Sequence, residues 1–215
     1  MSNEELRLRT AALLRDLGHE FVARELSDEQ LALIERHVGE VRDIVRAGEQ
    51  RRRTLPSGSL AEFKMAVPAN GELQRHQLFN DSIVSGGSNP MGLGAYLWRE
   101  DDVAVMEVTL GNAFEGAPGR AHGGIVAALI DETMGLVLAI NNELAFTAQL
   151  DITYVAPTPI NRPITARARL EKRSGRKLSI TANVEADSVV IAEAKALFIA
   201  VEPAKFLEML SALEL

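Results

Sequence analysis

Two groups of residues, eight positions apart, have the chemistry to act on a carbonyl group. His122, Gly123 and Gly124 directly precede a long apolar run, where a loop is expected to enter a helix. Backbone N–H groups at a helix start lack internal partners, the helix dipole there favours negative charge, and glycines let an oxygen approach closely. The two glycines therefore indicate either an oxyanion site or an ordinary tight turn.

The second group is Asp131, in the middle of the expected helix 124–140. This helix is apolar on nearly every face and must be buried, and aspartate has a poor helix propensity. Because a buried carboxylate needs a partner or a function, Asp131 is a candidate general base or nucleophile. The alternative is an acid on the one helix face that meets water, and Glu132 fits that description.

The spacing of the two groups sets a condition on how they act. Gly123 and Asp131 are about 12 Å apart along a helix that rises 1.5 Å per residue. One helix cannot direct both groups at one carbonyl, whereas two copies running antiparallel across a two-fold axis can. If the two residues cooperate, we expect an obligate homodimer with two active sites at the subunit interface, with a dimer of dimers as a further option.

The hydrophobic patterns predict the elements that position these groups. Six short segments, several with period-two alternation, are expected to be strands: 95–99, 103–110, 146–155, 164–172, 178–186 and 189–201. Short turns between them predict an antiparallel sheet. The fold class is therefore α+β, with an antiparallel sheet wrapped around a central buried helix. In the third strand we expect Leu150 and Tyr154 on one face and Thr147 and Asp151 on the other.

The N-terminal part of the chain has a different pattern, which divides the chain into three. Residues 1–55 form an N-terminal helical extension, 56–205 the main domain and 206–215 a tail. In the extension, apolar residues at helical spacing predict two helices with a break near Gly18. Ser27 and Gln30 have the spacing of a capping box at the start of the second helix.

Composition excludes several classes of protein. Of 215 residues, 47% are hydrophobic and 25% charged, which excludes disorder over most of the chain. The absence of cysteine excludes disulfides, thiolate metal sites and a cysteine nucleophile. A net charge of −7 and 5% aromatic residues argue against nucleic-acid binding. Without an uncharged apolar run of about 20 residues or an N-terminal signal, we expect a cytoplasmic protein that does not enter a membrane.

The motifs around the two groups resemble a known family. Residues 78–201 are similar to the hotdog-fold acyl-CoA thioesterase superfamily, in the branch of the phenylacetyl-CoA thioesterases and the human thioesterase superfamily members. The similarity rests on FEGAPG at 114–119, on HGG at 122–124 followed after six residues by Asp131, and on TAQLDITYVAP at 147–157. The N-terminal helices are outside it.

This resemblance implies roles for individual residues. The Gly123 amide would polarise the thioester carbonyl, with His122 and Gly124 shaping the turn. Asp131 would act as general base on water or as nucleophile, and Thr147 would hold that water or Asp131. The resemblance implies an acyl-CoA substrate and no metal or other cofactor.

The chain departs from the family pattern at one position. Many relatives carry an amide side chain six residues before the histidine, as a second donor to the carbonyl. This chain has Gly116 there, with Asn112 four residues earlier, so either the loop brings Asn112 to the substrate or the group is lacking.

Other candidates have weaker support. The turn that contains Arg173, Arg176 and Lys177 is basic and is a candidate site for the phosphates of coenzyme A, although ordinary surface charge explains it as well. Histidines 19, 37 and 76 have no metal-ligand spacing and are expected at the surface. Two alternatives to hydrolysis stay open: a non-catalytic acyl-CoA-binding hotdog module acting as a sensor, and a hotdog dehydratase, which is expected to use a histidine as its base.

Overall fold

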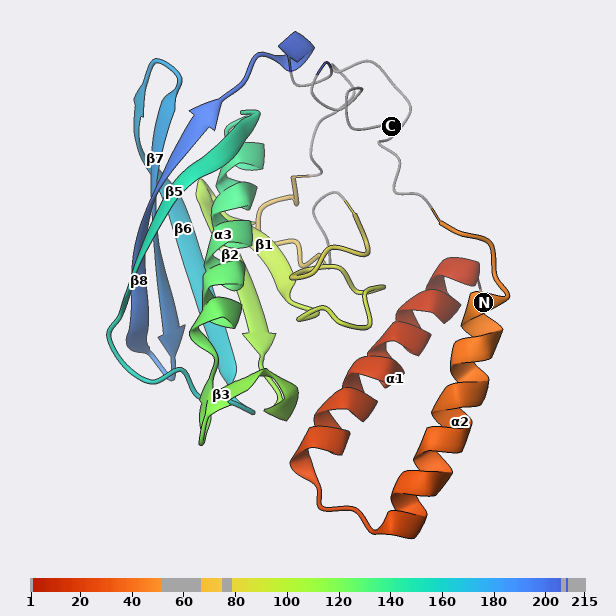
Figure 1. The fold of residues 1–215 in the computed structure, drawn as a ribbon. Coiled ribbons are helices and arrows are strands. Elements are labelled where there is room, and N and C mark those ends of the chain that lie inside the picture. Colours follow the sequence, from red (N-terminus) through yellow and green to blue (C-terminus); the bar gives the residue numbers. More distant parts are fainter. Residues whose placement is uncertain (1, 52–66, 75–78, 206–207, 209–215) are drawn as a thin grey trace.

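A computed structural model describes residues 2–51, 67–74, 79–205 and 208 of the chain. Two long helices come first, followed by a mixed region of strands and one further long helix (Figure 1). The helices are α1 (Asn3–Ala23), α2 (Asp28–Arg46) and α3 (Gly123–Ile140), with a short 3-10 helix η1 (Asn112–Phe114). The strands are β1 (Tyr96–Glu100), β2 (Val103–Thr109), β3 (Glu115–Ala117), β4 (Arg120–Ala121), β5 (Ala145–Tyr154), β6 (Pro163–Ser174), β7 (Lys177–Ala186) and β8 (Val189–Ala200).

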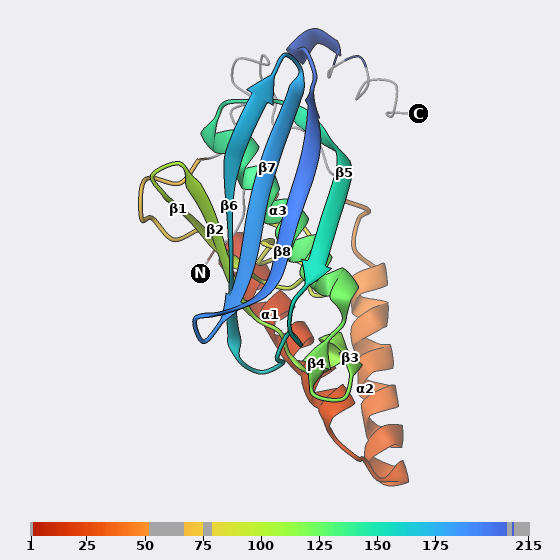
Figure 2. The same ribbon diagram turned by 90° about the vertical axis from the view of Figure 1, so that its left-hand side faces the viewer.

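Six of these strands form one antiparallel sheet in the order β1-β2-β6-β7-β8-β5. The sheet curves around α3, which lies against its concave face (Figures 1 and 2). The predicted α+β fold is confirmed, and each predicted strand is present within two residues of its expected bounds. Between β2 and α3 the chain forms η1 and the β3–β4 hairpin, which are too short to give a periodic pattern.

The core lies between α3 and the inner face of the sheet. Half of the residues of α3 are buried there, including Leu129, Ile130 and Met134, which are fully inaccessible to solvent. Alternate residues of the central strands complete the core, as Leu178, Ile180 and Val184 do in β7. By length and apolar composition alone α3 would also qualify as a membrane span, but its burial against the sheet is that of a core helix.

Helices α1 and α2 form a hairpin that projects away from the sheet (Figure 1). The predicted break near Gly18 is wrong, because α1 continues to Ala23 and the chain turns between the two helices at 24–27. A glycine inside a helix costs only about 1 kcal/mol relative to alanine, so the helix tolerates it. The predicted capping box at Ser27 and Gln30 is confirmed, with the Gln30 N–H donating to Ser27 Oγ at 3.3 Å.

Some sequence predictions fall on residues outside the described ranges. The boundary between extension and main domain at 55/56 is one of them, as are His76 and most of the C-terminal tail. The three-part division of the chain therefore stays a prediction.

Candidate active site

The start of α3 leaves one backbone donor available. His122 is the N-cap residue, and its Nδ1 accepts a hydrogen bond from the Gly124 N–H at 3.0 Å. Its carbonyl accepts from the Ile125 N–H at 2.9 Å and, at 3.4 Å, from the Val126 N–H. Within the described part of the chain, Gly123 thus has the one N–H of this first turn without an acceptor. Because an unpartnered N–H at a helix N-terminus favours a negatively charged oxygen, the geometry agrees with an oxyanion donor at Gly123.

Tyr154, at the end of β5, holds the same turn from the other side. Its hydroxyl donates to the Gly123 carbonyl at 2.7 Å. A Cβ on Gly123 would lie 3.2 Å from both the hydroxyl oxygen and Cζ of Tyr154, so a side chain at position 123 would push this contact apart. Burial raises the pKa of Tyr154, which keeps the phenol protonated and therefore a donor.

The Tyr154 hydroxyl and the His122 ring are joined through one peptide unit. Tyr154 donates to its carbonyl oxygen and His122 accepts from its N–H, since Gly123 O and Gly124 N belong to the same peptide. Hydrogen bonds at both ends of a peptide polarise it and strengthen one another. Sequence reasoning included Tyr154 in a motif but gave it no role, because only the tertiary structure brings the end of β5 to the start of α3.

Asp131 and Thr147 meet in the middle of α3. Thr147 Oγ1 donates to Asp131 Oδ1 at 2.9 Å, and Asp131 is half-buried. The resemblance implied that Thr147 holds either the reacting water or Asp131, and the structure has the contact with Asp131. The face predicted for Thr147 is wrong. Thr147 pairs with Phe198 and Gln149 with Leu197, so Ala148 is an extra residue in a β-bulge. A bulge reverses the alternation of side chains beyond it.

The bulge explains how polar and apolar groups share the inner face of β5. Thr147 before the bulge and Leu150, Ile152 and Tyr154 after it all face α3. An unbroken strand with period two would place Thr147 on the outer face, where it cannot reach Asp131. The bulge therefore positions the hydroxyl that contacts the carboxylate.

The neighbouring acid has a different environment. Glu132 Oε1 accepts from the Ser85 N–H at 3.0 Å and from the Ser85 hydroxyl, and Ser85 is fully buried. Glu132 thus attaches the loop that precedes β1 to α3, which corrects the expectation that it faces water. The two adjacent carboxylates differ in their surroundings, one bound to a buried loop and the other to a strand hydroxyl.

The position expected to carry a second carbonyl donor is closed to any side chain. A Cβ at Gly116 would lie 2.7 Å from the Cα of His122, so the amide found in many relatives cannot be accommodated there. Asn112, in η1, has its Oδ1 engaged by the Asn161 side-chain amide at 3.0 Å. That bond uses the acceptor of Asn112 and leaves its own amide N–H groups as donors.

The predicted phosphate-binding turn lies away from these groups. Arg173 forms an ion pair with Glu143, just beyond the C-terminal end of α3, and Arg176 Nε donates to the Ala200 carbonyl at 3.0 Å. Lys177 is exposed at the start of β7. The structure brings none of the three to Asp131 of the same chain.

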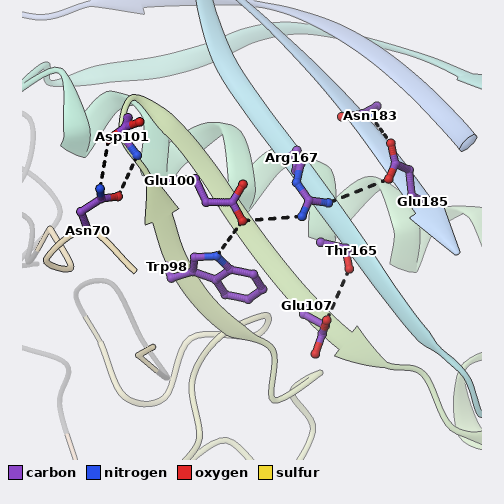
Figure 3. A network of polar contacts seen from close by, with 9 residues as sticks. All are labelled: Asn70, Trp98, Glu100, Asp101, Glu107, Thr165, Arg167, Asn183 and Glu185. Atoms are coloured by element: carbon purple, nitrogen blue, oxygen red, sulfur yellow. Dashed lines mark hydrogen bonds and ion pairs between the residues drawn. The ribbon is translucent and has the colours of Figure 1, made fainter. Parts of the chain in front are cut away.

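The outer face of the sheet carries charges of both signs. Arg167 lies between Glu100 of β1 and Glu185 of β7, at 3.6 and 3.9 Å (Figure 3). A hollow of about 660 Å³ on this face is lined by Arg167, Arg169 and Lys195 and also by three acids. These acids are Asp151, Glu171 and Glu193. Mixed charge of this kind does not favour a phosphate, and the described residues include no cluster of acids and histidines able to hold a metal ion.

His19 connects α1 to the loop before α3. Its Nδ1 accepts from the Ala113 N–H at 3.1 Å, and its ring stands edge-on to Phe114 with centroids 5.0 Å apart. Burial, the largest effect, lowers the pKa of His19; nearby Asp16 raises it and Arg15 lowers it further. His19 is therefore half-buried against this loop rather than freely exposed, whereas His37 is exposed and pairs with Glu40 at 3.1 Å.

Comparison with known proteins agrees with this geometry. A family model described as "Thioesterase superfamily" matches residues 118–192, which contain His122, Gly123, Asp131, Thr147 and Tyr154. Over 159 residues the chain is 38% identical to the protein named acyl-coenzyme A thioesterase THEM4 of Mus musculus, covering 71% of this chain and 68% of the mouse protein. The rat protein of the same name is 34% identical over 93 residues, 42% of this chain and 40% of the rat protein.

A solved structure shows the same fold along most of the chain. The crystal structure of protein RHA08564, described as a thioesterase superfamily protein, superposes with a TM-score of 0.74 at 22% identity. The superposition covers 90% of each chain. On the strength of the fold and of the mouse relative, this chain belongs to the thioesterase superfamily.

Proposed function

We propose that this protein is an acyl-CoA thioesterase, which hydrolyses a thioester to a carboxylic acid and free coenzyme A. The single observation that carries the proposal is the Thr147–Asp131 hydrogen bond, which fixes a half-buried carboxylate on the helix whose first N–H is open to an oxyanion. The names of the mouse and rat relatives support acyl-CoA as the substrate class.

The mechanism follows from the two groups on α3. The Gly123 N–H donates to the thioester oxygen and stabilises the negative charge that develops there. Asp131, as general base, takes a proton from water while the water oxygen bonds to the carbonyl carbon. Collapse of the tetrahedral intermediate breaks the C–S bond, and the leaving thiolate receives the proton. In the alternative route, an Asp131 oxygen attacks the carbonyl carbon and the C–S bond breaks, which gives a mixed anhydride and the coenzyme A thiolate. Water then hydrolyses the anhydride to the carboxylic acid and free Asp131, and the proton released from water goes to the thiolate.

The neighbouring residues position these two groups. Thr147 holds one carboxylate oxygen, so the other is directed at water or at the carbonyl. His122, Gly124 and Tyr154 fix the turn that presents the Gly123 N–H. Asn112 is the remaining candidate for a second donor to the carbonyl, since its amide N–H groups are free to donate.

The proposal requires two chains. Gly123 and Asp131 stay about 12 Å apart along α3, and that separation exceeds the reach of one carbonyl group. Strand β5 is at the edge of the sheet, and it exposes Phe146 and Tyr154, with Val155 exposed just after its end. Pairing of two β5 edges about a two-fold axis sets the helices antiparallel, with Gly123 of one chain facing Asp131 of the partner subunit. We propose this homodimer, alone or as a dimer of dimers, as the active form in the cytoplasm.

The basic turn is the proposed site for the phosphates of the substrate. Lys177 is exposed, and the ion pair of Arg173 and the carbonyl contact of Arg176 are both at the surface. We propose that these three residues contact the phosphates of coenzyme A. Substituting all three with glutamine should raise KM for acyl-CoA while leaving kcat nearly unchanged, because they do not touch the reacting carbonyl.

The decisive experiment is a thiol-release assay. Purified protein is incubated with acyl-CoAs from short and aromatic to long-chain, alongside Asp131→Asn. Release by the wild type and its loss in the variant would support hydrolysis at this carboxylate. Tight binding of acyl-CoA without release by either protein would contradict the proposal and favour the sensor.

A further inference from the structure

The N-terminal hairpin contains an apolar groove that the rest of the chain leaves open. Its volume is about 690 Å³, and it lies between α1 and α2. The apolar side chains that line it are Leu14, Leu17 and Phe21 of α1 and Leu31, Ile34 and Val38 of α2. The body of the protein contacts α1 on a different face, through Arg15 and His19. The groove is therefore not part of the contact between the hairpin and the sheet domain.

Helix α2 presents a continuous apolar seam along this groove. The seam consists of Leu31, Ile34, Val38, Val41 and Val45, which recur at alternating spacings of three and four residues. None of its members is buried, and four of them are between 40% and 70% exposed. Apolar residues at this spacing are the side of a helix that packs against another helix in a coiled coil.

We propose that the seam of α2 packs antiparallel against the same seam of a second copy of this chain. A two-fold axis perpendicular to a helix generates an antiparallel partner, which is the arrangement of an isologous interface. In this antiparallel pair of helices, Val38 packs against the partner's Val41, and Ile34 packs against the partner's Val45. Leu14, Leu17 and Phe21 of α1 form the second wall of the groove that receives the partner's helix.

The charges beside the seam favour the antiparallel orientation. With Val38 opposite the partner's Val41, Glu35 comes beside Arg42 of the partner subunit, and the symmetry repeats this pair. A parallel pairing instead places His37 beside the partner's Arg42 and Gln30 beside the partner's Glu35, with no attraction in either case. Arg42 now pairs at 3.1 Å with its exposed neighbour Asp43, an interaction that contributes little and is easily exchanged.

The hairpin projects away from the sheet, which leaves α2 open to a second copy of the chain (Figure 1). α1 also reaches the loop before α3, through the His19–Ala113 hydrogen bond. Pairing of the hairpins would therefore join the active-site loops of two subunits through their N-terminal helices.

The absence of cysteine from the chain allows a direct test. Full-length Val38→Cys and Val41→Cys chains, carrying different tags, are co-produced and mildly oxidised, and disulfide-linked dimers are identified on non-reducing gels and by mass spectrometry. The matched control is Leu33→Cys co-produced with Arg36→Cys, which has the same spacing on the opposite face of α2. Disulfides form only between Cα atoms within about 7 Å, so the pattern reports the packing.

The proposal expects disulfide linkage between the Val38→Cys chain and the Val41→Cys chain, and none in the control pair. Efficient linkage of Val38→Cys with itself would indicate a parallel seam and overturn the orientation. No linkage in any pair would overturn the proposal. Maleimide labelling of the Val38→Cys variant that falls only when anionic phospholipid vesicles or long-chain acyl-CoA are added would assign the groove to a lipid and also overturn it. The thiol-release assay is independent, so hydrolysis and hairpin pairing can fail separately.

Discussion

Helix α3 and the apolar seam of helix α2 have opposite environments. Helix α3 is enclosed by a sheet, half of its residues are buried, and its two acids each have a hydroxyl partner. Helix α2 has an equally regular apolar seam but no buried residue. Helix α3 is packed by its own chain, whereas the apolar side chains of α2 are exposed to solvent.

The two regions therefore differ in whether a single chain buries their apolar side chains. The sheet domain has a full core, and β5 is at one edge of its sheet. The hairpin lacks a core altogether, and isolated helices of this length gain most of their stability from packing. Substitutions in the sheet domain should therefore affect chemistry and folding within a chain, while those on the α2 seam should affect association.

The largest effect is expected at Asp131. Replacing it with asparagine keeps the shape and an acceptor for Thr147 but removes the base, so kcat should fall by about 10²- to 10⁴-fold, the usual range for a lost general base. Thermal stability and acyl-CoA binding should change little. Thiol release, a thermal melt and equilibrium binding measure the three quantities. Retained turnover in Asp131→Asn would remove this residue from the mechanism.

A smaller loss is expected at Thr147. Valine has the same shape without the hydroxyl, and loss of a hydrogen bond to a charged group costs about 1.5–3 kcal/mol, or roughly tenfold to a hundredfold in kcat. Thr147→Ser, which keeps the donor, is the matched control and should recover most of the rate. Full activity in the valine variant would show that the bond to Asp131 does not contribute to catalysis.

Tyr154→Phe tests the hydrogen bond by which the end of β5 holds the first turn of α3. A lost neutral hydrogen bond costs about 0.5–1.5 kcal/mol, so kcat should fall roughly threefold to tenfold with KM nearly constant. Tyr96, in β1, is the other tyrosine of the chain, and Tyr96→Phe is the matched control. If KM rises and kcat is unchanged, Tyr154 contributes to substrate binding rather than to the position of the Gly123 N–H.

The sequence predicted the sheet domain well because its signals are local. Alternation in each strand, short turns and an apolar run of helical length specify a sheet around a buried helix without knowledge of any contact. The contacts of the candidate active site were harder to predict from the sequence. The bulge at Ala148 that turns Thr147 toward Asp131 has no signature in the alternation itself, which continues through Phe146, Leu150 and Tyr154.

The other contacts that the sequence did not predict have the same cause. Glu132 and His19 are ordinary polar residues in the sequence, and only the fold brings them to Ser85 and to Ala113. Gly116 was an unexplained departure until the structure placed the His122 backbone against it. Each of these contacts joins two segments that lie far apart in the sequence. The sequence patterns predict the structure of each segment but not how close the two segments lie in the fold.

The smallest effect is expected at His19, which joins the two regions compared above. Burial lowers the pKa of the folded His19 below the value near 6.5 that it has when unfolded, so the unfolded state binds the proton more readily. The stability from this residue is then complete above about pH 6.5 and is lost as the pH falls toward the folded pKa. His19→Asn retains an acceptor for the Ala113 N–H but does not titrate. The Tm of the wild type, relative to the Tm of His19→Asn, should therefore fall between pH 7.5 and pH 5.5. A difference in Tm that does not change with pH would show that the histidine docks α1 in both protonation states.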